Sequence, residues 1–319
     1  MKQWIFLSAA LLVSAGCKTT ELGPAKPLPW RMQQAYVKRV RDPRIFGMDL
    51  VQTPSGVEIR GGGRFHDWQQ ETLDMMAANP IRPVVSLAGG VGQTWPVLLD
   101  LTASKSWLSY DVARQLKAHP VAEGKPVLVR LPGETDIMAC LSTTSSVKLG
   151  QLQIEHPIVY VRLATGSMGP LARGITTPGI QGVVGWNALR QFQLIQLIYP
   201  AQKVTISMLD TDEYEPHPEY LVASLPIIKN ETACMVRGTV NGKEMPILID
   251  PAGDFQVATP GGVQATIGLG DGLVLSGAGA ATSPAGVRVG AQLLQNYLVT
   301  ICPKDQVLHL ELLQSIEAE

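Results

Sequence analysis

Charged residues are scarce in this sequence, at 17% of its 319 positions, and no segment is dense in lysine or arginine. Proteins that bind nucleic acids present a basic surface that neutralises phosphates. The 26 basic and 27 acidic residues leave a formal net charge of −1, which argues against that class of partner. The expected partners are other proteins or neutral polymers, and no nucleic acid.

Cysteine is also rare, with four residues in the chain: Cys17, Cys140, Cys234 and Cys302. If Cys17 is used for lipidation, three remain, so one chain can form at most one disulfide. Each of these three lies in or beside an apolar, strand-like run. Small buried hydrophobic residues are the simplest interpretation.

Motifs that hold metals or activate a serine are missing. The five histidines are scattered without a metal-ligand spacing or an H-E-x-x-H pattern. The G-x-S-x-G turn of serine hydrolases does not occur around Ser167. The sequence therefore predicts no metal and no other cofactor.

The sequence is instead rich in residues that build strands and turns. Hydrophobic residues make up 45%, and the chain carries 31 glycines and 23 prolines, which are many for a helical protein. The aliphatic runs are rich in valine and isoleucine, which favour pleated sheets. A mainly β fold with short helices is the prediction.

The first residues, MKQWIFLSAALLVSAGC, join a positive start to an apolar stretch and small residues. This pattern is typical of an export signal and is too short for a membrane span. Its end resembles a bacterial lipobox, so residues 1–17 are predicted to be a lipoprotein signal with Cys17 as the lipidated residue. Plain secretion with a structural cysteine, or another anchor, is the alternative. Residues 18–30 then form a tether.

One sequence pattern occurs twice in the chain. Residues 95–104 read WPVLLDLTAS and residues 245–254 read MPILIDPAGD, so each is an apolar residue, a proline, three aliphatic residues and an aspartate that enters a turn. A strand-like run precedes each copy, and the second pair is joined by Asn241-Gly242, a dipeptide that favours a type I′ hairpin turn. The two aspartates are Asp100 and Asp250.

The duplication continues downstream. GVVGWNALRQF (182–192) and VRVGAQLLQNY (287–297) both place an aliphatic residue and a glycine, Gly185 or Gly290, before a short helix. A repeat of this length predicts two related lobes.

The proline-broken, polar stretch between the copies predicts a linker. The segment before the first lobe has no assigned packing, although DWQQETLDMMAAN within it predicts a short helix capped by Asp67. The predicted boundaries are 31–82 for this N-terminal segment, 83–210 for the first lobe, 211–222 for the linker and 223–315 for a trimmed second lobe.

Taken together, the strand, aspartate turn, aliphatic residue with glycine and short helix of each half resemble the aspartic proteinase fold in its tandem, retropepsin-like form. The family motif D-T-G-A-S is matched in part by Asp100-Leu101-Thr102-Ala103-Ser104, and less well by Asp250-Pro251-Ala252-Gly253. The resemblance covers about residues 84–315 and implies two β-barrel lobes. It also implies that Asp100 and Asp250 form a catalytic pair, which shares one proton and activates a water against a peptide carbonyl; the aspartic-protease pair is itself the standard example of two coupled carboxylates.

Both copies depart from the family motif. The hydroxyl residue that braces one loop against the other is replaced by Leu101 and Pro251, and the following glycine is replaced by Thr102 and Ala252. Proline lacks a backbone donor, and residues with a side chain disfavour a turn that needs positive φ.

Three functions follow from these observations. The first is an aspartic endopeptidase, tethered to the bacterial cell envelope and facing the periplasm or exterior, that hydrolyses envelope or periplasmic polypeptides. The second is a catalytically inactive relative that binds extended peptide by strand addition. The third is a structural envelope lipoprotein. The oligomeric state is left open.

Overall fold

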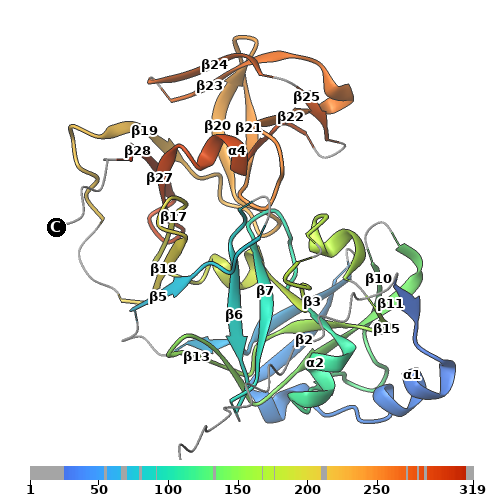
Figure 1. The fold of residues 1–319 in the computed structure, drawn as a ribbon. Coiled ribbons are helices and arrows are strands. Elements are labelled where there is room, and N and C mark those ends of the chain that lie inside the picture. Colours follow the sequence, from blue (N-terminus) through green and yellow to red (C-terminus); the bar gives the residue numbers. More distant parts are fainter. Residues whose placement is uncertain are drawn as a thin grey trace, which may run out of the picture.

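The computed structural model describes residues 25–313 except 54–55, 66–69, 79–80, 91, 132–133, 167, 176, 210–213, 271, 279 and 284–285. The predicted fold class is confirmed: the chain is mainly β, with two related, curled half-barrel sheets (Figure 1). Its α-helices are short: α1 (Trp30–Val37), α2 (Tyr110–Gln115), α3 (Trp186–Leu189) and α4 (Ala291–Leu294). No helix in the described part of the chain is long and apolar enough to cross a membrane.

Seven strands of the first lobe form a continuous path in the order β14-β8-β16-β7-β6-β12-β13. Their bounds are β6 (Val84–Ala88), β7 (Thr94–Asp100), β8 (Trp107–Ser109), β12 (Ser146–Leu149), β13 (Leu152–Glu155), β14 (Val159–Arg162) and β16 (Gly182–Gly185). The pairs β7–β16 and β8–β14 are parallel, and the others are antiparallel. The end of β7 is buried on both faces, which explains its unbroken aliphatic run.

The second lobe repeats this order strand for strand, as β25-β22-β26-β21-β20-β23-β24. The bounds are β20 (Met235–Val240), β21 (Lys243–Asp250), β22 (Val257–Thr259), β23 (Ala265–Leu269), β24 (Leu273–Ala278), β25 (Ala280–Thr282) and β26 (Arg288–Gly290). Each step has the same parallel or antiparallel sense as its counterpart. The β20–β21 turn has positive φ at both Asn241 and Gly242, as a type I′ turn requires.

A six-stranded sheet joins the lobes, in the order β19-β28-β27-β17-β18-β5. Its strands are β5 (Gln70–Asp74), β17 (Leu194–Ile198), β18 (Lys203–Ser207), β19 (Leu221–Pro226), β27 (Tyr297–Cys302) and β28 (Val307–Leu312). At its centre Ile195 pairs with Ile301 and Gln196 with Thr300. Gly185 and Gly290 are equivalent residues of the two lobes, and the same spacing makes Ile195 equivalent to Thr300 and Gln196 equivalent to Ile301. The equivalents of the residues in one pair therefore form the other pair, so a pseudo-twofold axis passes between β17 and β27.

The helix predicted over 67–79 is wrong. Residues 67–69 lie outside the described residues, but Gln70–Asp74 form β5, which pairs with β18 along its whole length. Leu73 is buried there between exposed neighbours, which is the alternation of a strand. Pairing with an existing sheet edge outweighs the weak helical preference of this short segment.

The N-terminal segment packs on the first lobe. It contributes the hairpin of β2 (Met48–Thr53) and β3 (Gly56–Gly61), preceded by the 3-10 turn Pro43–Phe46, and just before it β1 (Lys26–Pro27) pairs with β15 (Ala164–Thr165). The tether predicted over 18–30 is wrong for residues 26–28, because Lys26 and Pro27 join a sheet and Leu28 is buried; residues 18–24 lie outside the described residues.

The first lobe is larger because it has elements with no counterpart in the second. They are β9 (His119–Pro120), β10 (Leu128–Leu131), β11 (Glu134–Thr143) and the 3-10 turn Gly169–Ala172. In addition, α2 follows β8 where the second lobe has only the shorter 3-10 turn Pro260–Gly262 after β22. Cys140, Cys234 and Cys302 are buried, as predicted, and none of them forms a disulfide within the described residues. Burial raises the pKa of Cys140 and of Cys234 to about 12, so both are neutral thiols at neutral pH.

Candidate functional site

The two aspartates end equivalent strands. Asp100 is the last residue of β7 and Asp250 the last of β21, and each stands in register with the final glycine of a neighbouring parallel strand. Asp100 pairs with Gly185 and Asp250 pairs with Gly290. The duplicated sequence pattern therefore folds into duplicated geometry.

Both glycines are required because the aspartate loop passes directly against them. A Cβ on Gly185 would lie 2.4 Å from the carbonyl oxygen of Lys105, and one on Gly290 would lie 2.2 Å from that of Phe255. Lys105 and Phe255 occupy the same position in their loops, five residues after the aspartate. Contacts this short are not found for real Cβ atoms, so each site admits only glycine.

The same backbone hydrogen bond closes each loop. The Trp186 N–H donates to the Ala103 carbonyl at 2.7 Å, and the Ala291 N–H donates to the Gly253 carbonyl at 2.9 Å. Neither Thr102 nor Ala252 has positive φ. The turns thus form without the glycine of the family motif.

The loops are braced across the lobes by the backbone carbonyls of their second residues. The Cys234 N–H donates to the Leu101 carbonyl at 2.8 Å. The residue of the first lobe that is equivalent to Cys234 is Pro83. The carbonyl of each accepts a backbone hydrogen bond from the strand of its own lobe that ends in the aspartate. Proline has no N–H to donate. The Tyr199 hydroxyl instead reaches the Pro251 carbonyl, at 3.5 Å.

Arg82 completes the brace on the second loop. Its Nε donates to the Ala252 carbonyl at 3.0 Å and its Nη2 lies 2.8 Å from Oδ1 of Asp254. The Arg82 side chain is only 2% exposed, and its Nη1 also donates to the Ile81 carbonyl. A buried guanidinium is tolerated because its donors are paired.

The Asp100 carboxylate holds its own turn. Oδ1 accepts hydrogen bonds from the Thr102 N–H at 2.8 Å, the Thr102 hydroxyl at 2.7 Å and the Ala103 N–H at 3.2 Å. Asp100 is 4% exposed, whereas Ser104 farther along the loop is exposed. This is the turn-capping role that aspartate often plays.

Asp250 is bound by two arginines. Its Oδ2 forms ion pairs with Nη2 of Arg173 and with Nη1 of Arg288, the latter at 3.1 Å. The aspartate is 0% exposed, and its Oδ1 is buried without a hydrogen-bond partner among the described residues. Burial raises the pKa of Asp250, the guanidinium of Arg173 lowers it, and the nearby charge of Asp100 raises it again.

The arrangement brings the two predicted catalytic residues close enough for their charges to interact, but it differs from a working protease pair. Such a pair must present carboxylate oxygens to a water and a peptide. Here the Oδ2 of Asp250 is taken by two guanidiniums, and Oδ1 of Asp100 is taken by its own loop. Both carboxylates are buried.

Sequence reasoning missed Arg173 and Arg288. Arg288 carried a usable signal, because it is a charged residue in a short core strand where the first lobe has Val183. Arg173 carried none, since it follows a 3-10 turn that has no counterpart in the second lobe.

No group of histidine, cysteine, aspartate or glutamate residues in the described ranges has the arrangement of a metal site. The predicted lipidation residue, Cys17, lies outside the described residues. A scan against protein-family models finds none that matches the chain, and a search of curated proteins finds no match.

Proposed function

We propose that this protein is a catalytically inactive relative of the aspartic proteinases that binds extended polypeptide by adding it to a sheet edge. The support for the relationship is the strand order that the lobes share and the aspartates that end the same strand in each. The alternative, an active endopeptidase that uses Asp100 and Asp250, is an outcome of the experiment below.

The observation that carries the proposal is the double ion pair on Asp250. Aspartic proteases need one carboxylate to take a proton from water while the other donates to the developing oxyanion. A carboxylate that is 0% exposed and bound by Arg173 and Arg288 cannot contact either group. The paired loops then stabilise the lobe interface.

A difference between the lobes supports the binding mode. In the first lobe the outer edge of β13 is covered by β4 (Arg64–Phe65) of the N-terminal segment, through the pairs Ile154–Phe65 and Glu155–Arg64. Its counterpart in the second lobe, β24, pairs only with β23 among the described strands. The N-terminal segment thus adds a strand to the first lobe, whereas no described strand pairs with the equivalent edge of the second lobe.

The open edge has suitable side chains. Val274 on β24 is 64% exposed, and Leu273 on the opposite face is buried. The stretch 272–283 contains no charged residue. Edge strands that resist pairing usually carry charges or prolines, so this edge suits the main-chain hydrogen bonds of an extended peptide.

The experiment uses reduced, carboxymethylated α-lactalbumin, a permanently unfolded polypeptide, as the probe. We expect saturable binding without cleavage from acid to neutral pH. Val274→Lys places a charge on the exposed edge and is expected to lower the affinity about tenfold. Val263→Lys is the matched control, since Val263 is also 64% exposed but lies outside any strand, and it is expected to bind as the wild type does.

Cleavage that disappears in both Asp100→Asn and Asp250→Asn would establish the endopeptidase instead. Absence of both binding and cleavage would leave a structural role. Equal loss of binding in the two valine variants would show that added charge, rather than the β24 edge, controls the affinity.

We also propose that Cys17 anchors the protein to a membrane of the bacterial cell envelope, with the lobes facing the periplasm or exterior. The support is the lipobox-like end of the leader sequence. Metabolic labelling with a fatty acid is expected to mark the wild type and not Cys17→Ser. Labelling of both forms would contradict the assignment.

A further inference from the structure

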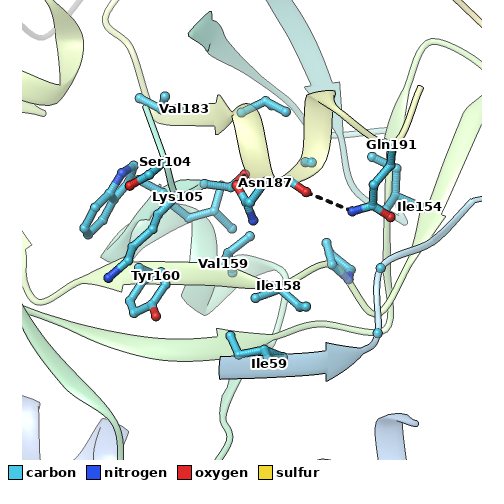
Figure 2. Close-up of a pocket in the computed structure, with 18 of the residues that line it drawn as sticks. Ile59, Ser104, Lys105, Ile154, Ile158, Val159, Tyr160, Val183, Asn187 and Gln191 are labelled. Carbon is cyan, nitrogen blue, oxygen red and sulfur yellow. Dashed lines mark hydrogen bonds between the residues drawn. The ribbon is translucent and has the colours of Figure 1, made fainter. Parts of the chain in front are cut away.

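The first lobe contains a pocket of about 530 Å³, far larger than a water site. Its walls come from the lobe core and from the β2–β3 hairpin, which forms a separate two-stranded sheet and closes one side. Figure 2 shows Ile59 of β3 facing Ile158 and Val159 of the lobe across this space. Pockets of this size hold small organic ligands.

Aliphatic side chains are the largest group in the lining. Residues from five strands of the half-barrel line it, among them Leu87, Val97, Val147, Ile154 and Val184. A space lined in this way favours a ligand with an apolar body, because burial of that body removes its surface from water.

One end of the pocket carries an unpaired cation. Lys105 places its Nζ 4.6 Å from the centre of the Tyr160 ring and makes no ion pair within the described part of the chain. In Figure 2 these two side chains lie together at one end, and Ile154 and Gln191 lie at the other. Lys105 is half-buried, and this burial lowers its pKa, because the charged ammonium has lost part of its hydration.

The other charged residues of the lining already have partners. Arg190 pairs with Glu231 at 3.2 Å, and Glu58 pairs with Arg60 at 3.0 Å. Asn187 accepts a hydrogen bond from the Ser106 hydroxyl through Oδ1, so its amide group faces the pocket as a donor. One free ammonium and one amide donor suit a group with a single negative charge.

From this arrangement we propose that the pocket binds an aliphatic monocarboxylate, with its carboxylate at Lys105 and its chain among the aliphatic side chains. Neither Asp100, Asp250 nor any residue of β24 lines the pocket. The site is therefore separate from the peptide-binding edge, and either can fail without the other.

The test is calorimetric titration of the protein with decanoate, and with decanol as the neutral probe of the same chain length. We expect saturable binding of decanoate with weaker binding of decanol. Lys105→Met keeps the length of the side chain and removes its charge, so the affinity for decanoate is expected to fall at least about tenfold, to the level of decanol. Lys243→Met, at an exposed lysine outside the pocket, is the matched control and should not change the affinity.

A second variant tests the cavity itself. Ile158→Trp fills the space from the wall formed by a half-buried residue, and is expected to abolish binding of both probes while the thermal unfolding transition remains. The proposal is overturned if decanoate does not saturate, if decanol binds as tightly as decanoate, or if Lys105→Met leaves the decanoate affinity unchanged. The last result would mean that Lys105 only packs on Tyr160.

Discussion

The first and second aspartate loops have the same backbone and different surroundings. Each follows a parallel-paired strand, passes against a glycine and closes with the same N–H to carbonyl bond, to Ala103 or Gly253. The Asp100 carboxylate, however, is held by its own loop, whereas the Asp250 carboxylate is held by two arginines from elsewhere in the chain. The two loops therefore share their backbone geometry and differ in the partners of their carboxylates.

The difference teaches that backbone geometry and side-chain function are constrained separately. The two glycines are fixed by backbone carbonyl oxygens that would lie 2.4 Å and 2.2 Å from a Cβ, a clash that no rotamer change can relieve. The carboxylate partners are side chains, which single substitutions can change. Two lobes can therefore place aspartates at equivalent backbone positions while the carboxylates bind different partners.

The largest expected effect tests the backbone geometry that the two aspartate loops share. Gly290→Ala and Gly185→Ala each place a Cβ against a backbone carbonyl oxygen, so each is expected to lower the free energy of unfolding by more than about 4 kcal/mol, or to prevent folding. Denaturant unfolding measures the change. Gly90→Ala is the control, because a Cβ there meets nothing within 4 Å and the residue does not have positive φ. A mild effect at only one of the two motif glycines would show that the loops are not equivalent.

A smaller effect is expected where the loops differ. Arg82→Met removes three hydrogen-bonding contacts from a side chain that is 2% exposed, and leaves the Ala252 carbonyl without its donor. We expect the free energy of unfolding to fall by about 2 to 4 kcal/mol. Arg44→Met, which breaks an exposed pair with Asp42, should produce no resolvable change. Amide exchange should quicken at Gly253 and not at Ala103; equal loosening of both loops would contradict the asymmetry.

The pH dependence of stability sharpens the contrast between the aspartates. The folded-state pKa of Asp250 is raised, so its contribution to stability is present below the unfolded-state pKa and is lost as pH rises through the raised value. We therefore expect the free energy of unfolding of the wild type to fall, relative to that of Asp250→Asn, as the pH rises from the unfolded-state pKa of Asp250 to its raised folded-state pKa. Denaturant unfolding at a series of pH values measures the difference. If the wild type gained relative stability instead, the two arginines would outweigh the burial of the carboxylate.

The smallest expected effect concerns the tyrosine that substitutes for the missing N–H of Pro83. Tyr199→Phe removes a hydroxyl 3.5 Å from the Pro251 carbonyl, which is the limit of a hydrogen bond. We expect a loss of about 0.5 to 1 kcal/mol in the free energy of unfolding. A loss as large as that of Arg82→Met would mean that Tyr199, rather than Arg82, carries the brace on the second loop.

Much of this architecture could be predicted because the two copies share the same local signals. The hairpin signal at Asn241-Gly242, the aliphatic run before each aspartate and the glycine at 185 or 290 are set by short-range geometry, and all lie where the pattern predicted. A repeated pattern also predicts its own pairing, because equivalent residues take equivalent places in each lobe.

The features that could not be predicted depend on contacts between distant segments. Residues 70–74 form a strand only because β18 offers an edge to them. The arginines on Asp250 come from positions 77 and 38 residues away along the chain. The pocket requires the β2–β3 hairpin to close over the first lobe, which no local signal in residues 48–61 indicates.

The most direct measurement is amide hydrogen exchange of the full chain with and without the unfolded α-lactalbumin probe. We predict slower exchange on addition of the probe, concentrated in residues 273–278 of β24, with no change at β13, whose edge β4 already covers, and with the probe recovered intact. Protection at β13 rather than β24, or cleavage of the probe that depends on Asp100 and Asp250, would contradict the proposed binding edge.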